Sequence, residues 1–383
     1  MKKKGQVCIK GRKGGNMPEL LKNKYNYEFL QELALRVKAV YPSFQADDFV
    51  KDIMDDAWEA LELKARMRQI SVKLGRYLPD DYEQALDILL KVAEGYPAGF
   101  NDFAFMCFPD FVEVYGQEER YWDLSMAALG KFTMLSTSEF AVRPFIIKNE
   151  ERMMRQMAVW AGHDNEHVRR LSSEGCRPQL PWGQALTCFK KDPSPVLGIL
   201  ERLKADPSLY VRKSVANNLN DISKTHPGLV IKTAKDWYGK NEDTDWIVKH
   251  GCRTLLKKGN REVLDIFGFA DADCVEVTGF ALDDACVAVG EKLSFSFTVV
   301  AKKAARIRLE YGIDYVKANG TWSRKIFQIS EITLQENEKR NYTKKHSFAE
   351  VSTRKHYPGT HSVTLIVNGT GMGTLDFEVL PIE

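Results

Sequence analysis

The chain has 383 residues, of which 44% are hydrophobic and 28% are charged, as in an ordinary soluble globular protein. It is too long for one typical hydrophobic core, so two domains are expected. No segment approaches the run of about 18 apolar residues that marks a transmembrane helix, and we expect no membrane partner.

The net charge of +3 is unevenly distributed. Residues 1–16 carry six basic residues and no acidic one, and they have no apolar segment of the kind found in secretory signals. We interpret them as a disordered basic arm, a tag remnant or an upstream start before a native beginning at Met17. Residues 17–275 carry 35 basic and 39 acidic residues, so a nucleic-acid surface there must be a local patch.

The spacing of apolar residues is helical from residue 17 to about residue 270. Leu30, Leu33, Ala34 and Val37 form one apolar stripe, and Leu86, Leu89, Leu90 and Ala93 form another. Recurrent prolines divide this region into helices of ordinary length joined by short loops. We therefore predict a helical domain over 17–270.

A short motif repeats within the helical region, with an acidic helix start followed by valine and a basic residue. Val168, Val211 and Val248 mark its copies, at spacings of 43 and 37 residues. These spacings suit HEAT-like units of roughly 40–47 residues, whose stacking produces a superhelix with an extended groove. The fold class predicted for 17–270 is thus a mainly α, HEAT-like α-α superhelical repeat domain.

The apolar pattern changes to a period of two after about residue 270. Residues 293–299 and 305–311 alternate clearly, and 362–368 and 375–379 surround a Gly-rich turn and predict a hairpin. About seven short strands over 274–383 favour a C-terminal Ig-like β-sandwich. The seven cysteines are scattered and no C-x-x-C pair occurs, so neither a disulfide framework nor a structural zinc site is expected.

No common catalytic motif occurs, but three segments carry a more specific pattern. They are Ser136–Phe145, then Arg169–Pro178 with Pro181–Gly183 close behind, and Val211–Asp221. In this order they resemble the AlkC branch of the HEAT-like alkylpurine DNA glycosylases. The resemblance covers nearly all of residues 17–383, and it includes the Ig-like tail that some members of that family carry.

The resemblance implies an active site at Glu139, Glu174, Trp182 and Asp221. An N3-alkylated purine or pyrimidine carries a formal positive charge and leaves readily, while breaking the C1′–N bond builds positive charge on the sugar. Carboxylates stabilise that charge or position water, and an aromatic face attracts a cation, so no metal or cofactor is required. The resemblance further implies that the base is not flipped into a tight pocket, unlike in most base-processing enzymes.

Each of these positions also has a purely structural interpretation. Glu139 completes a capping box with Ser136, and Glu174 lies mid-helix as a solvated or arginine-paired acid. Trp182 packs in the core beside a proline turn, and Asp221 ends a helix or occupies a turn.

Basic residues recur at equivalent places in the repeats and on predicted loops of the tail, where they could contact phosphates. The alternatives are pairing with neighbouring carboxylates in the repeats, and ordinary solvated loops in the tail. The resemblance suggests that the Ig-like domain closes on DNA from the minor-groove side. The predicted DNA-binding residues are Arg143, Arg169, Arg170, Arg177, Arg212, Lys213, Lys249, Arg253 and Lys325.

The sequence therefore predicts a bacterial DNA N-glycosylase of base excision repair, acting as a monomer on double-stranded DNA with alkylated bases. It would release 3-methyladenine, with 3-methylcytosine as a further candidate, and leave an abasic site. Glu139 and Asp221 would stabilise the sugar cation or place water, Trp182 would contact the lesion or deoxyribose, and Glu174 would assist one of the acids. A cytoplasmic location is expected, on the nucleoid when DNA is bound. The alternative is a non-catalytic HEAT-repeat scaffold that binds a protein or undamaged DNA.

Overall fold

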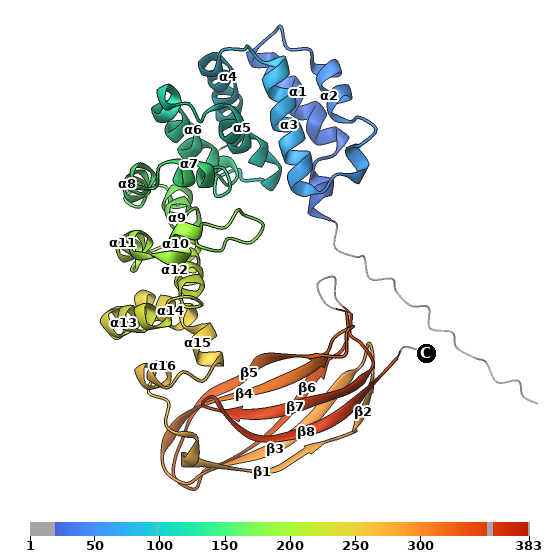
Figure 1. Cartoon of the computed structure of the whole chain (residues 1–383), viewed down its shortest axis with the longest axis vertical. Coiled ribbons are helices and arrows are strands. Elements are labelled where there is room, and N and C mark those ends of the chain that lie inside the picture. Colours follow the sequence, from blue (N-terminus) through green and yellow to red (C-terminus); the bar gives the residue numbers. More distant parts are fainter. Residues whose placement is uncertain (1–19, 98, 351–354, 382–383) are drawn as a thin grey trace, which may run out of the picture. The chain divides into compact units, whose positions relative to one another are not determined.

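The computed structural model describes residues 20–97, 99–350 and 355–381 (Figure 1). The predicted arm over 1–16 lies outside the described residues. Helices fill the chain as far as Ile266 and strands follow from Val275, as in the predicted helical repeat fold with a β-sandwich tail. The described chain forms two compact units, one comprising residues up to Cys176 with Leu180–Leu186, and the other Arg177–Gln179 with residues from Thr187 onward. The helical region is therefore divided between the two units.

The first unit consists of helices whose packing partners lie close in the chain. Contacts such as α7 with α8 and α8 with α9 are typical of stacked helical repeats. Its helices are α1 (Tyr27–Val40), α2 (Ala46–Ile53), α3 (Leu63–Tyr77), α4 (Tyr82–Glu94), α5 (Cys107–Tyr115), α6 (Trp122–Leu135), α7 (Val142–Lys148), α8 (Glu150–Trp160) and α9 (Glu166–Glu174).

The second unit contains the remaining helices and all described strands. Its helices are α10 (Thr187–Lys191), α11 (Ser194–Leu203), α12 (Leu209–Ile222), α13 (Pro227–Trp237), α14 (Glu242–Gly251), α15 (Arg253–Lys257) and α16 (Arg261–Ile266). Its strands are β1 (Val275–Leu282), β2 (Cys286–Ala288), β3 (Lys292–Ala301), β4 (Ala305–Val316), β5 (Trp322–Leu334), β6 (Lys339–Ser347), β7 (Gly359–Val367) and β8 (Thr370–Leu380).

The predicted apolar stripes form the helix cores. All four residues of the first stripe are buried on α1, which begins where the Asn26 side chain accepts a hydrogen bond from the Phe29 amide. On α4 the buried stripe runs through Leu86 and Leu89, whereas Leu90 lies partly exposed at its margin.

The repeat motif occupies equivalent helices. Val168 of α9, Val211 of α12 and Val248 of α14 are each at most 1% exposed. In two copies the following arginine folds back on the turn before its helix. Arg169 Nη1 donates to the carbonyls of residues 163 and 164 at 3.0 and 2.7 Å. Arg212 Nη1 donates in the same way to the carbonyls of residues 206 and 207, at 2.8 and 2.9 Å. The repeated arginine of the motif therefore forms the same hydrogen bonds in both copies.

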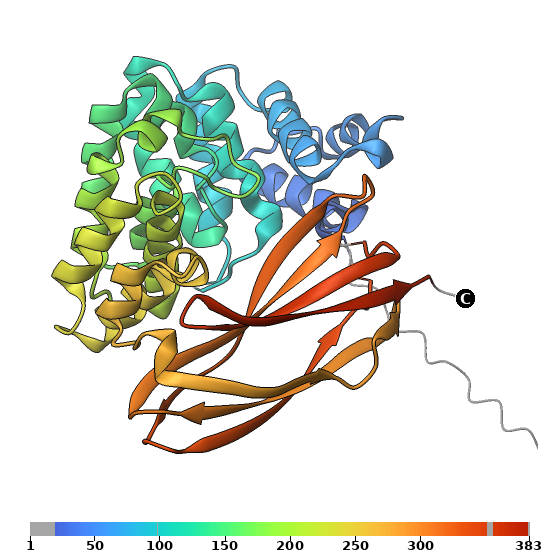
Figure 2. The same ribbon diagram turned by 60° about the horizontal axis from the view of Figure 1, so that its bottom comes forward.

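The strands form a three-stranded sheet, β1-β3-β6, and a five-stranded sheet, β2-β8-β7-β4-β5 (Figures 1 and 2). Alternate residues of β3 are buried, and Phe295 of β3 lies edge-on to Tyr311 of β4 at 5.2 Å, so the two sheets share one core. The predicted hairpin is β7–β8. Its turn is shorter than the Gly-rich segment between the predicted strands, because β8 already begins at Thr370 and contains Gly371 and Gly373. The turn is Asn368–Gly369, with φ of +47° and +80°, as a type I′ turn requires.

The sandwich joins the last helices through backbone and side-chain bonds within the second unit. The Asn368 side chain donates to Ala270 O at 2.7 Å, and the Ala270 amide donates to Arg306 O at 3.1 Å. A Cβ atom on Gly369 would lie 2.2 Å from the Cα of Gly259, so only glycine fits this contact.

Candidate active site

Glu139 lies in the turn between α6 and α7. Its Oε2 atom accepts hydrogen bonds from Thr137 Oγ1 and Arg170 Nη1, both at 2.8 Å, and its side chain is only 12% exposed. The alternative of a capping box is wrong, because α7 begins only at Val142 and the Ser136 hydroxyl has no hydrogen-bond partner among the described residues. The carboxylate is therefore oriented by Arg170 and not by a helix start.

Glu174 is the last residue of α9, not a mid-helix residue as predicted. Arg170 lies one turn earlier, and its Nη2 atom is 3.7 Å from Glu174 Oε1. One guanidinium thus lies against two buried carboxylates, Glu139 and Glu174, that come from different parts of the chain. This arrangement agrees with the alternative of an arginine-paired Glu174. Arg170 was predicted to contact phosphate, and in this structure its guanidinium pairs with these two carboxylates.

Trp182 is 63% exposed, so the alternative of core packing is wrong. It occupies a four-residue turn in which the Gly183 amide donates to Leu180 O at 3.1 Å. Pro181 stands at the second position and Trp182 has a φ of +60° at the third, which makes this a type II turn. Glycine is the usual residue at that position, and a tryptophan there stores backbone strain of about 1–3 kcal/mol.

Two cations of the first unit hold the segment that carries Trp182. Arg143, 1% exposed, donates from Nη1 to Gly175 O at 2.9 Å and from Nε to Gln184 O. The predicted DNA contact of Arg143 is therefore a misassignment, because its guanidinium is enclosed by backbone carbonyls.

Lys64 of α3 was not singled out from the sequence. Its Nζ atom donates to Trp182 O at 3.2 Å and lies 4.8 Å from the centre of the Phe140 ring. Phe140 directly follows Glu139, so Lys64 connects the two segments that carry the candidate site. No local pattern marks this lysine, since its role depends on a contact between distant parts of the chain.

Asp221 lies in the last turn of α12, within the second unit. Its side chain is 2% exposed and pairs with Arg177 Nε at 2.8 Å and Lys224 Nζ at 2.9 Å. A carboxylate at a helix C-terminus opposes the helix dipole, and the two cations offset that cost. Burial lowers the pKa of nearby Arg253, and Asp221 acts in the opposite direction. Because Arg177 is buried against Asp221, the structure does not present it to phosphates as predicted.

Most predicted DNA-binding cations of the repeats have partners inside the protein. Arg169 and Arg212 bond backbone carbonyls, and Arg212 also pairs with Asp243 at 3.0 Å. Lys249 pairs with Glu331 of β5, and Arg253 donates to His250 O at 2.7 Å and to Asn217 Oδ1 at 3.0 Å. The alternative of internal pairing therefore describes these residues in this structure, and their contact with phosphates stays a prediction.

Two predicted DNA-binding lysines are exposed. Lys213 follows Arg212 on α12, and no described residue forms an ion pair with it. Lys325 lies on β5, an outer strand of the five-stranded sheet, and not on a loop as predicted.

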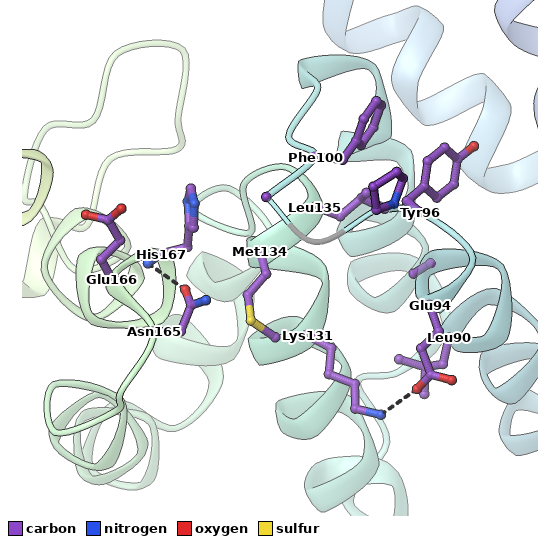
Figure 3. A pocket seen from close by; sticks show the side chains of 13 residues that line it. Leu90, Glu94, Tyr96, Phe100, Lys131, Met134, Leu135, Asn165, Glu166 and His167 are labelled. Carbon is purple, nitrogen blue, oxygen red and sulfur yellow. Dashed lines mark hydrogen bonds and ion pairs between the residues drawn. The ribbon is translucent and has the colours of Figure 1, made fainter.

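A cavity of about 590 Å³ lies elsewhere in the first unit, between the ends of α4 and α6 and the start of α9 (Figure 3). Its apolar side includes Leu90, Met134 and Phe100, and its rim carries the Lys131–Glu94 ion pair at 3.1 Å. None of the four candidate catalytic residues lines it.

Among the described residues, no group of three or more histidine, cysteine or acidic side chains could hold a metal ion. Within the same residues, no helix is both long enough and apolar enough to cross a membrane.

Comparisons with known proteins match the two parts of the chain to two family models. Residues 136–262, which include all four candidate catalytic positions, match the model of the DNA alkylation repair enzymes. Residues 276–381 match the C-terminal Ig-like domain of the uncharacterised protein YhaZ.

Two relatives match over almost their whole length. The uncharacterized protein YhaZ of Bacillus subtilis (strain 168) is 47% identical over 94% of this chain and 99% of its own. The structure of the Pseudomonas fluorescens alkylpurine DNA glycosylase AlkC, bound to DNA containing an abasic site analog, is 37% identical with a TM-score of 0.90. It covers 94% of this chain and 100% of that one. This chain therefore belongs to the AlkC-type family of DNA alkylation repair glycosylases.

Proposed function

We propose that this chain, as a monomer, hydrolyses the bond between deoxyribose and a cationic N-alkylated base in double-stranded DNA. 3-Methyladenine is the first candidate substrate and 3-methylcytosine the second, and the product is an abasic site. The observation that carries the proposal is the exposed, strained Trp182 in the same unit as the buried carboxylates of Glu139 and Glu174. The relative AlkC is described with an abasic site analog, which represents the product of such a reaction.

The chemistry needs preorganised negative charge and little else. The base leaves with the bonding electron pair and becomes neutral, and the sugar gains positive charge. A water oxygen then bonds to C1′, and its proton passes to a carboxylate or to solvent. Glu139 and Asp221 stabilise the sugar cation or place this water, and Glu174 assists through its shared arginine. A fixed carboxylate needs no reorganisation during the reaction, which is the main source of its effect.

Trp182 supplies an aromatic face to the cationic base or the deoxyribose. Cation–π attraction is worth about 0.5–2 kcal/mol, and it favours a charged lesion over a neutral base. Because the ring is exposed, it could contact a damaged base that stays in or near the DNA double helix, which supports a mechanism without base flipping. None of the four candidate catalytic residues lines the cavity of Figure 3.

The test is release of free methylated bases from duplex DNA treated with a methylating agent. The wild type should release 3-methyladenine, and Glu139→Gln and Asp221→Asn should each release it about 10²–10³-fold more slowly. Glu151→Gln is the matched control, because Glu151 lies in an exposed ion pair on α8 with Arg155. DNA affinity and thermal stability are measured on every variant.

The second candidate is a non-catalytic scaffold, and the ion pairs of all three acids are the observation that favours it. Tight DNA binding by the wild type with no base released would establish the scaffold and exclude the enzyme. Equal loss of stability and activity in both acid variants would likewise assign these carboxylates to the structure.

A further inference from the structure

The turn that carries Trp182 is held in a conformation that its own sequence disfavours. The ring is largely exposed and therefore contributes little packing, while φ of +60° at a bulky residue is costly. Such a turn persists only if surrounding contacts fix it. Two contacts of this kind reach the segment from outside, through Arg143 and Lys64.

Arg143 fixes the two ends of the segment. Its guanidinium donates to Gly175 O, just after α9, and to Gln184 O, just after the turn. A planar fork can hold two carbonyls at once, which a lysine ammonium does with less geometric definition. Arg143 is only 1% exposed. Its bond to Gly175 O holds the start of the segment at the residue that follows Glu174.

Lys64 fixes the tip of the segment. It donates to the carbonyl of Trp182 itself, at 3.2 Å, and its ammonium lies over the ring of Phe140. Because Phe140 is the neighbour of Glu139 in the chain, Lys64 contacts both the Trp182 turn and the segment that carries Glu139. Lys64 is exposed, so its side chain is not needed to fill the core.

We propose that Lys64 and Arg143 are positioning residues that together hold the strained turn so that Trp182 faces the substrate. This inference rests on the proposed function. It adds two residues to the four candidate catalytic positions that the family resemblance implies. They act through Trp182, so their contribution exists only while the indole is present.

The experiment is a double-mutant cycle on release of 3-methyladenine from methylated duplex DNA at saturating enzyme. Lys64→Met and Arg143→Lys should each slow release about 10-fold or more in the wild type, because a small displacement of a positioned group has large kinetic effects. Neither change should slow release further in a Trp182→Ala background. Lys64→Arg should restore release, since arginine also donates to the Trp182 carbonyl. Lys91→Ala, an exposed lysine in an ion pair with Asp87 on α4, is the control.

The outcomes separate the inference from the function. If Trp182→Ala slows release while Lys64→Met slows it equally with and without the indole, the positioning role is overturned and the glycosylase stands. If Trp182→Ala releases base at the wild-type rate, the positioning role is also overturned. Should Arg143→Lys fail to fold, Lys64→Met and its arginine rescue still decide the question, because Lys64 is exposed.

Discussion

Arg170 of α9 and Glu139 of the α6–α7 turn form an ion pair in which Nη1 lies 2.8 Å from Oε2, and the same guanidinium lies 3.7 Å from Glu174. All three side chains are mostly buried. Two acids in such a place repel each other unless a cation lies between them. Arg170 therefore allows both carboxylates to occupy one site.

Replacing Arg170 by glutamine should impair catalysis without weakening the phosphate contacts. We expect about 10- to 100-fold slower base release, because the two acids lose their common orientation. Removing one partner of a buried pair also destabilises the fold, by about 3 kcal/mol here. Base release, urea unfolding and the salt dependence of DNA binding are the measurements. The control is Arg155→Gln, which breaks an exposed pair with Glu151. A smaller salt slope in the Arg170 variant would instead identify a phosphate contact.

Replacing Lys213 by glutamine should weaken a phosphate contact without slowing base release, which is the opposite of the result expected for Arg170→Gln. Lys213 is exposed and forms no ion pair with a described residue, so it is available to neutralise a phosphate. Loss of one phosphate contact should reduce the slope of log K against log salt by about one, and leave base release at saturating enzyme unchanged. An unchanged salt slope would show that this face of α12 does not contact DNA. Lys249→Gln is the comparison, because its ammonium is engaged by Glu331 and its salt slope should not change.

Replacing Trp182 by glycine should separate stability from activity. Glycine adopts a φ of +60° without strain, and the exposed indole contributes little packing, so the free energy of unfolding should stay within about 1 kcal/mol of wild type or rise. Base release should fall sharply, because the aromatic face is lost. Urea unfolding and base release are measured together. A large loss of stability would show that the indole packs against the protein and would contradict the strain argument.

The fold could be predicted because its apolar periods are strong. The stripe from Leu30 to Val37 is buried as expected, and the Asn368–Gly369 turn joins the expected hairpin. Two basic segments of the tail, around Lys325 and over 339–346, are instead predicted as loops from the sequence, although they lie on β5 and β6. Each of these strands ends its sheet and is exposed or partly exposed along most of its length. An edge strand with few buried residues lacks the alternation that identifies a strand.

The partners of the site residues could not be predicted, because side-chain pairing depends on tertiary contacts. A pattern of arginine beside valine looks the same whether the guanidinium faces phosphate or protein. In the structure Arg143 is enclosed by carbonyls and Arg177 by Asp221, while Lys64, from a segment without any motif, contacts the Trp182 turn. The sequence therefore identifies which residues are candidates for the site. Which cations pair with acids, which hold the Trp182 turn and which are exposed without an ion pair can be told only from the structure.

Acid should destabilise this protein as the pH falls below about 6.5, because burial lowers the pKa values of His167, His250 and His361 below their ordinary value of 6.5. Below pH 6.5 the unfolded chain binds protons that the folded chain resists, so the free energy of unfolding falls as pH decreases from about 6.5 toward the lowered values. Above 6.5 this contribution is fully present. Thermal unfolding from pH 7.5 to 5 should show a declining Tm, and His361→Gln should flatten the decline. His163→Gln, at an exposed position, is the control. A Tm that is level between pH 6.5 and 5 in the wild type would contradict the assignment of these three histidines.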